Sequence, residues 1–74
     1  MKYENVTLYT VDNCRHCDTM KQKLKIFGIL YKSIHLSTSK DINDIVLKTG
    51  IMSAPIIQND DKYYDYFQFS ELLK

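Results

Sequence analysis

Short runs of apolar, β-branched and aromatic residues predict four strands along this chain. The runs cover Val6–Val11, Leu30–Leu36, Pro55–Gln58 and Lys62–Phe67, and this composition is typical of strands. The residues Asn59–Asp61 separate the last two runs, and these residue types tolerate the backbone of a tight turn. We therefore predict that the third and fourth strands form a hairpin.

Apolar residues spaced three and four positions apart predict a helix after the first strand. Its apolar face would carry Cys17, Met20, Leu24 and Phe27. Asp12 and Asn13 precede this helix and are residue types that favour N-cap and turn positions. Gly28 is suited to end it.

Two further helices are predicted downstream. The first begins at Thr38 and Asp41, which resemble a capping box, and ends at Gly50. Its apolar face would carry Ile42, Ile45 and Val46. The second is short and is predicted over Ser70–Lys74.

The predicted order of elements is β-α-β-α-β-β-α. Because a helix joins the first two strands, they should run parallel through a right-handed crossover, whereas the hairpin strands should run antiparallel. The sequence therefore predicts an α/β fold with a mixed four-stranded sheet flanked by helices. We expect residues 1–74 to form this fold as a single domain.

Composition narrows the possible partners and location. Apolar residues make up 45% and charged residues 26% of the 74 positions, which is ordinary for a soluble globular protein. The net charge of +1 gives no reason to expect nucleic acid or an anionic membrane as a partner. No apolar run has the length of a membrane span, and the first residues, MKYENVTLYT, lack the apolar core of a signal peptide. We expect a cytoplasmic monomer.

Both cysteines lie in the stretch VDNCRHCDTM, at the predicted start of the first helix. On a helix, the spacing of Cys14 and Cys17 brings their Cα atoms to about 5–6 Å, within range of a disulfide. A loop this short restrains the unfolded chain very little, so the pair would be a poor structural staple. The spacing instead indicates a dithiol that can open and close with little backbone movement.

The two thiols should differ in reactivity. Cys14 would meet free backbone N–H groups and the positive end of the helix dipole, which favour a thiolate. Arg15 adds a cation beside it and His16 adds part of one. We therefore predict that Cys14 is a nucleophile with a lowered pKa. Cys17 lies on the apolar face, so we predict that it is buried, protonated and the resolving thiol.

A zinc site would require four ligands in tetrahedral geometry. The chain has two cysteines and two histidines, and His16 and His35 do not have the spacing of a ligand pair. We therefore predict no metal. His35 is interpreted as a strand residue with a polar tip, and His16 as a residue that either faces solvent or tunes the charge of the thiols.

The single proline, Pro55, starts the third predicted strand, where a missing backbone N–H costs no ladder hydrogen bond. In the predicted topology, Ser53 and Ala54 lie beside the cysteine turn. Two interpretations stay open. Pro55 is either a plain strand-start proline or a cis proline that turns the Ala54 backbone toward the thiols, where it could pair with a bound peptide or glutathione.

Together these motifs resemble the thioredoxin superfamily in its smallest form, and within it the glutaredoxins and the glutaredoxin-like NrdH redoxins. LYTVDNCRHC is similar to the opening strand and active-site turn of that group, and SAPII to its cis-proline segment. YYDYFQFSELL is similar to its end segment, with Phe67 at the aromatic position. The resemblance covers nearly the whole chain. It implies a minimal thioredoxin fold with Cys14 as nucleophile, Cys17 as resolving thiol and Pro55 as a cis proline.

Departures from the family pattern concern the electron donor. Glutaredoxins that use glutathione resemble one another in a C-P-Y-C turn, a T-V-P segment and a G-G-x-D-D stretch. Here His16 takes the tyrosine position, Ser53 and Ala54 replace T-V, and the last stretch is absent. This favours reduction by thioredoxin reductase over reduction by glutathione. The end segment around Tyr66 also departs from that of the NrdH redoxins.

The predicted function is reduction of protein disulfides through the Cys14–Cys17 dithiol, with no bound cofactor beyond that redox-active disulfide. The resemblance makes ribonucleotide reductase the favoured substrate. Two alternatives stay open: a glutathione-dependent glutaredoxin, which would need Cys14 alone for deglutathionylation, and a non-catalytic adaptor with this fold. Tyr66 and Phe67 are interpreted either as core and edge covering or as part of a docking surface beside the thiols.

Overall fold

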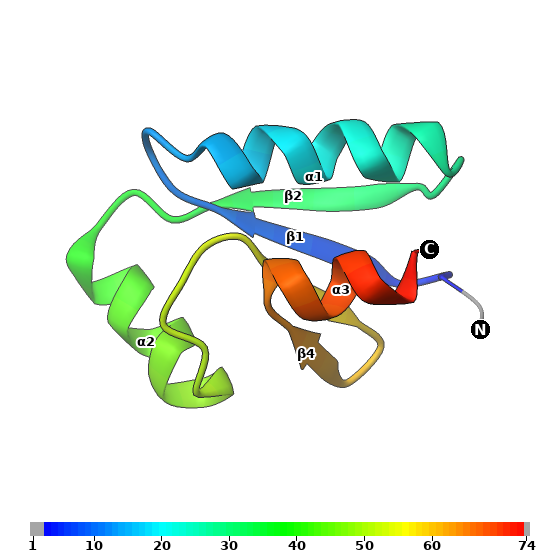
Figure 1. The fold of residues 1–74 in the computed structure, drawn as a ribbon. Helices are drawn as coiled ribbons and strands as arrows, with labels where there is room; N and C mark the ends of the chain where they lie inside the picture. The colour runs from blue at the N-terminus through cyan, green and yellow to red at the C-terminus, as the bar shows by residue number, and fades with distance from the viewer. Residues whose placement is uncertain (1–2, 74) are drawn as a thin grey trace.

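The computed structural model describes residues 3–73 (Figure 1). Its strands are β1 (Val6–Thr10), β2 (Tyr31–His35), β3 (Ile56–Asn59) and β4 (Lys62–Tyr64), and its helices are α1 (Arg15–Ile26), α2 (Ser39–Thr49) and α3 (Tyr66–Leu72). This order confirms the predicted β-α-β-α-β-β-α arrangement. The helices of this described part are too short or too polar to cross a bilayer.

The strands form one mixed sheet in the order β2-β1-β3-β4. β1 runs parallel to β2, so that Thr10 lies opposite His35 at the carboxyl end of both strands. β1 and β3 are antiparallel, and β3 and β4 form the predicted hairpin. Asp60 in its turn has a positive φ of 56°, as expected for a residue type that tolerates the left-handed region. The first strand differs from its predicted bounds by one residue at its carboxyl end, and the second and third differ by one residue at each end.

The main core lies on one face of the sheet, beneath α1 and α3. Alternation along β1 buries Val6 and Leu8 on this face. The buried cluster draws apolar side chains from the sheet, from α1 and from the end of the chain: Val6, Leu8, Met20, Leu24, Ile57, Phe69 and Leu73. Because both helices rest on the same core, the first turns of α1 and α3 lie close together.

α2 lies apart from α1 and α3 (Figure 1). Its buried residue Ile45 lines a pocket of about 360 Å³ together with Tyr9 of β1 and Ile56 of β3. The Lys48 amino group lies 5.6 Å from the ring centre of Tyr63 in β4. Tyr63 raises the pKa of Lys48, first through a hydrogen bond and second through charge. α2 therefore covers the face of the sheet opposite the main core.

The caps of α2 follow the sequence closely. The backbone N–H of Asp41 donates to the hydroxyl of Thr38, the N-cap, at 3.1 Å. Gly50 ends the helix with a φ of 74°, and its N–H donates to the carbonyl of Val46. A left-handed residue at this position is the usual way to stop a helix.

The start and end of α1 differ from prediction. Its N-cap is Cys14 itself, not Asp12 or Asn13, because the sulfur accepts the hydrogen bond that a capping side chain normally provides. Phe27, which was predicted on the apolar face, is the C-cap and is 55% exposed. It lies beyond the last helical residue, where the backbone leaves the helix and no longer directs side chains toward the core.

The predicted strand Lys62–Phe67 is wrong at its carboxyl end. β4 stops at Tyr64 and α3 begins at Tyr66, so these two tyrosines do not share a strand face and the predicted start of the helix at Ser70 is too late. The cause is a capping box at Asp65. The Gln68 N–H donates to the Asp65 carboxylate at 2.7 Å, and the Asp65 N–H donates to the Gln68 side chain at 3.0 Å. The predicted last helical residue, Lys74, lies outside the described residues.

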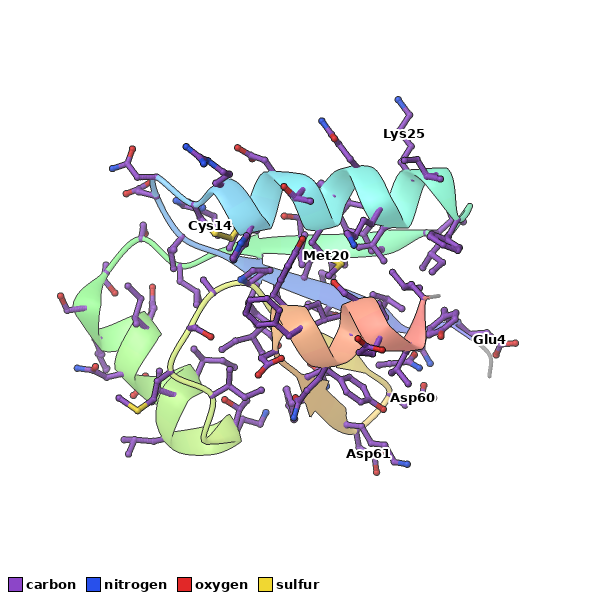
Figure 2. All side chains as sticks on the ribbon, viewed as in Figure 1. Glu4, Cys14, Met20, Lys25, Asp60 and Asp61 are labelled. Carbon is purple, nitrogen blue, oxygen red and sulfur yellow. A yellow bond between two sulfur atoms is a disulfide. The ribbon has the colours of Figure 1, made fainter. Side chains whose placement is uncertain are left out.

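One contact joins the two ends of the described chain. The Tyr3 hydroxyl donates to the Leu72 carbonyl at 3.3 Å, and the Tyr3 ring packs edge-on against Phe69 at 5.6 Å. Figure 2 places neighbouring Glu4 at the opposite end of the molecule from Cys14. The ends of the described chain are therefore remote from the cysteine turn.

Candidate active site

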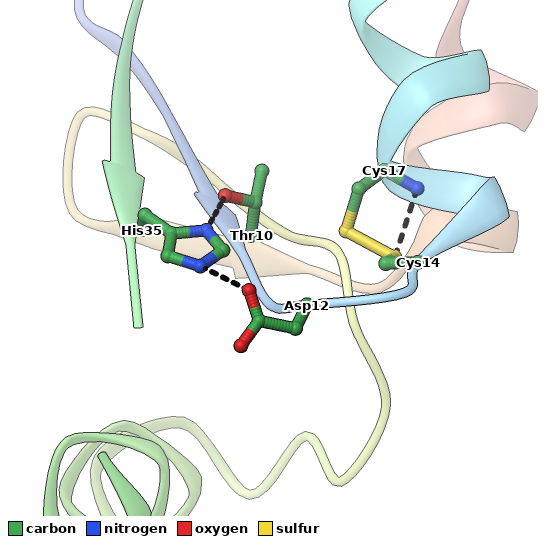
Figure 3. A network of polar contacts seen from close by, with 5 residues as sticks. All are labelled: Thr10, Asp12, Cys14, Cys17 and His35. Atoms are coloured by element: carbon green, nitrogen blue, oxygen red, sulfur yellow. Dashed lines mark hydrogen bonds and ion pairs between the residues drawn. A yellow bond between two sulfur atoms is a disulfide. The ribbon is translucent and has the colours of Figure 1, made fainter. Parts of the chain in front are cut away.

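The cysteine turn joins β1 to α1 and holds both sulfur atoms. Cys14 and Cys17 form a disulfide, with their Cα atoms 5.2 Å apart, as the spacing predicts. Cys14 is half-buried at the N-cap, whereas Cys17 is 2% exposed on the core side of α1. The Cys17 backbone N–H donates to the Cys14 sulfur at 3.0 Å (Figure 3). This N–H and the helix dipole would both stabilise a thiolate on Cys14 after reduction.

An open pocket of about 440 Å³ lies directly beside Cys14. Its walls come from the cysteine turn and from the loop before β3: Val11, Asn13, Cys14, Arg15, His16 and Ala54. The Ala54–Pro55 peptide bond is cis, so the plain strand-start interpretation of Pro55 is wrong. Pro55 is buried, and Ser53 lines the neighbouring pocket beneath α2 rather than this one.

The pocket beside Cys14 adjoins the apolar pocket beneath α2. Val11 and Ala54 line both of them. Met52, which also lines the apolar pocket, is 88% exposed at its rim. A bound polypeptide could therefore contact Cys14 and an apolar surface at the same time.

Aromatic side chains from α3 pack against the cysteine turn. The ring of Tyr66 stacks on His16 with 4.2 Å between centroids and an interplanar angle of 4°. Phe67 meets the same imidazole edge-on at 5.7 Å and is 67% exposed. Lys23 of α1 places its amino group 5.7 Å from the centre of the Tyr66 ring. The early start of α3 thus brings Tyr66 and Phe67 against His16, which lies between the two cysteines, in agreement with the docking-surface interpretation.

A polar network of Thr10, Asp12 and His35, which was not predicted from the sequence, lies behind this turn. His35 contacts the Thr10 hydroxyl through Nδ1 at 3.0 Å and the Asp12 carboxylate through Nε2 at 2.9 Å (Figure 3). The available signal was that Thr10 and His35 end two adjacent parallel strands, whose carboxyl ends meet at the same edge of the sheet. Within residues 3–73, no group of three or more His, Cys, Asp or Glu side chains is placed so that it could hold a metal ion.

The glutaredoxin family model matches residues 6–64. This segment contains all four strands, the cysteine turn and the cis proline. The chain belongs to the glutaredoxin family. Family membership and the Cys14–Cys17 pair together make it a thiol–disulfide oxidoreductase. The matched segment ends before α3, so the residues Tyr66 and Phe67 lie outside it.

Known proteins similar to this glutaredoxin include a curated relative and solved structures. The glutaredoxin-like protein NrdH of Lactococcus lactis subsp. cremoris (strain MG1363) is 32% identical over 69 residues, covering 93% of this chain and 96% of that protein. Glutaredoxin 1 from Francisella tularensis, solved with cacodylate, has a TM-score of 0.76 at 17% identity, with 90% and 88% of the two chains covered. A glutaredoxin from Archaeoglobus fulgidus has a TM-score of 0.67 at 24% identity, with 93% and 85% covered. The two structures support the thioredoxin-like fold.

Proposed function

We propose that this glutaredoxin reduces disulfide bonds in protein substrates through a two-thiol cycle. The observation that carries the proposal is the asymmetry of the cysteine turn. Cys14 lines an open pocket and accepts a backbone hydrogen bond, whereas Cys17 is almost fully buried one helical turn away. This arrangement suits an accessible nucleophile and a protected second thiol.

The cycle starts from the reduced pair. The Cys14 thiolate attacks one sulfur of the substrate disulfide, forms a mixed disulfide and expels the other substrate sulfur as a thiolate, which takes a proton from solvent. Cys17 then loses its proton and attacks the Cys14 sulfur. This step forms the Cys14–Cys17 disulfide and releases the second substrate thiolate. Two electrons pass from the protein dithiol to the substrate, and an external reductant must return them.

The surroundings of Cys14 support a polypeptide as substrate. The pocket beside Cys14 shares Val11 and Ala54 with the apolar pocket beneath α2. Largely exposed Phe67 packs edge-on against His16, which lines the pocket beside Cys14. Glutathione is a small molecule with a carboxylate at each end and an ammonium group at one of them, so a binding site must supply charged groups and backbone donors at both ends. The G-G-x-D-D stretch that glutathione-using glutaredoxins have in common is absent from this sequence.

The similarity to a glutaredoxin-like protein NrdH extends over almost the full length of both chains. On this resemblance we propose thioredoxin reductase as the electron donor and ribonucleotide reductase as a substrate. If the second part is right, the reduced protein supports repeated turnover of a ribonucleotide reductase. No stimulation above a control that lacks any dithiol would contradict it.

The electron donor can be tested with the oxidised wild-type protein. NADPH consumption is followed once with thioredoxin reductase and once with glutathione plus glutathione reductase, using an insulin disulfide as final acceptor. We expect rapid consumption with thioredoxin reductase alone. Consumption only with glutathione would overturn the proposed donor, and silence in both assays, with both thiols titratable, would favour a non-catalytic adaptor. Cys14→Ser is the control for consumption that does not pass through the thiols.

A further inference from the structure

Asp12 is an acidic residue close to the reactive cysteine turn. Asp12 lies two residues before Cys14, and the first N–H groups of α1 have no partner inside the helix. A carboxylate is stabilised at such a helix end by the same N–H groups and dipole that stabilise a thiolate. Asp12 is therefore a natural competitor of Cys14 for the amino end of α1.

The structure turns this carboxylate away from the helix. Figure 3 shows the Asp12 side chain pointing toward His35 and away from both cysteines. His35 Nε2 lies 2.9 Å from Asp12 Oδ1, and His35 Nδ1 lies 3.0 Å from the hydroxyl of buried Thr10. We propose that His35 is a positioning residue for the thiol chemistry, which holds the Asp12 carboxylate away from the amino end of α1 and leaves that end to Cys14.

Hydrogen-bonding rules fix how the network is arranged. A carboxylate only accepts hydrogen bonds, so Nε2 of His35 carries the proton that faces Asp12. With a neutral imidazole, Nδ1 accepts from the Thr10 hydroxyl. With a charged imidazolium, Nδ1 donates to the same oxygen, because a hydroxyl can rotate to accept. His35 therefore holds Asp12 in either protonation state, and Thr10 fixes the imidazole from the other side.

Little folding stability depends on this pair. The side chains of His35 and Asp12 are 48% and 78% exposed, and exposed ion pairs contribute little. Variants at these two positions should therefore fold, so their effect on the thiol can be measured directly. The inference rests on the proposed function in one respect, namely that Cys14 is the reacting thiol.

The test is a double-mutant cycle on the reduced protein, read by iodoacetamide alkylation of Cys14 and by the ultraviolet absorbance of its thiolate against pH. We expect His35→Ala to raise the pKa of the Cys14 thiol and to slow alkylation at low pH by up to about fivefold. This upper limit is the full effect of one unit charge roughly 5 Å away through water, and the freed carboxylate only moves closer to the thiol. Asp12→Asn should not slow alkylation. The double variant should match Asp12→Asn, because no carboxylate remains to be released.

Two matched controls complete the design. Asp61→Asn makes the same charge change in the hairpin turn, at a distance from Cys14 (Figure 2), and should leave alkylation unchanged. Ser33→Ala changes an exposed residue of β2 without touching the network. An unchanged rate in His35→Ala would overturn the proposal. So would a double variant as slow as His35→Ala, since the imidazole would then act without Asp12. Alkylation needs no disulfide substrate, so failure here is distinct from failure of the proposed function.

Discussion

At the scale of single residues, the two sulfur atoms have different surroundings although one helical turn separates them. Cys14 faces an open pocket and Cys17 faces the core. His16 is held by a stacked ring, and Asp12 is held by an imidazole. The cysteine turn therefore contacts side chains that reach it from α3 and β2, in addition to the residues of the C-R-H-C sequence itself.

The different roles of the two thiols can be tested with Ellman's reagent. Reduced wild-type protein should release both halves of the reagent and end as the internal disulfide, because Cys17 resolves the adduct on Cys14. Cys17→Ser should release a single half and retain the other on Cys14, as a mass spectrum of the intact protein would show. Cys14→Ser should react slowly, since its remaining thiol is buried. A stable adduct on wild-type protein would contradict the proposed resolving role.

Contacts between side chains that lie far apart in the sequence were not predicted. The exposed and buried thiols followed from helical spacing, which is local. The contacts His16–Tyr66 and Thr10–His35 join positions far apart in the sequence. These contacts depend on the register of β1 and β2 and on the first residue of α3. A periodic pattern of apolar residues does not predict a register or a helix start to within one residue.

At the scale of elements, the position of α3 decides which side chains reach the active site. The aromatic run before Phe67 favours a strand by composition, but the reciprocal hydrogen bonds of Asp65 and Gln68 start a helix instead. The spacing of these two residues was visible in the sequence. The tyrosine-rich composition around it is typical of strands and favours the wrong element. The caps and the apolar spacing of α2 agree with each other, and α2 was predicted correctly. The remaining elements were predicted with small differences at their ends.

The cap of α3 gives a prediction for Asp65. Replacing it with alanine removes the carboxylate that accepts from the Gln68 N–H, so Asp65→Ala should lower the free energy of unfolding by about 1 kcal/mol. The measurement is the urea midpoint followed by circular dichroism. Asp61→Ala, in the exposed hairpin turn, is the matched control and should have little effect. An equal loss in both variants would mean that the cap does not stabilise α3.

The end of α2 gives a second prediction at this scale. Gly50 has a φ of 74°, and a Cβ atom added there would meet no other atom within 4 Å. Gly50→Ala should therefore cost only the left-handed backbone penalty, about 1 kcal/mol. Gly50→Asn should cost less, because asparagine tolerates this conformation. Equal urea midpoints for the glycine and alanine proteins would show that the helix can end differently.

At the scale of the whole molecule, one small core stabilises the sheet and both helices that carry the active site. For a chain of this length, the total free energy of unfolding is about 4–11 kcal/mol. Removing a single large buried side chain costs about 3–5 kcal/mol. The loss of one core aromatic residue should therefore bring the molecule close to global unfolding.

Phe69 tests this margin, because it is fully buried and packs against Tyr3 and Tyr64, with 5.6 Å between ring centroids in each pair. Phe69→Ala should lower the melting temperature by about 15 °C or more. Phe67→Ala makes the same substitution at a largely exposed position of the same helix and should change the melting temperature little. Similar melting temperatures for both variants would contradict this account of the core.

The contact between Tyr3 and Leu72 makes a circular permutation of the chain feasible. Because the two ends of the described chain touch at a point remote from Cys14, a short glycine-serine linker could connect them. New ends could then be opened in the exposed turn at Asp60 and Asp61. Such a circular permutant would keep β1, the cysteine turn and α1 in one uninterrupted segment, so that a reporter domain could be attached opposite the thiols while their surroundings stay intact.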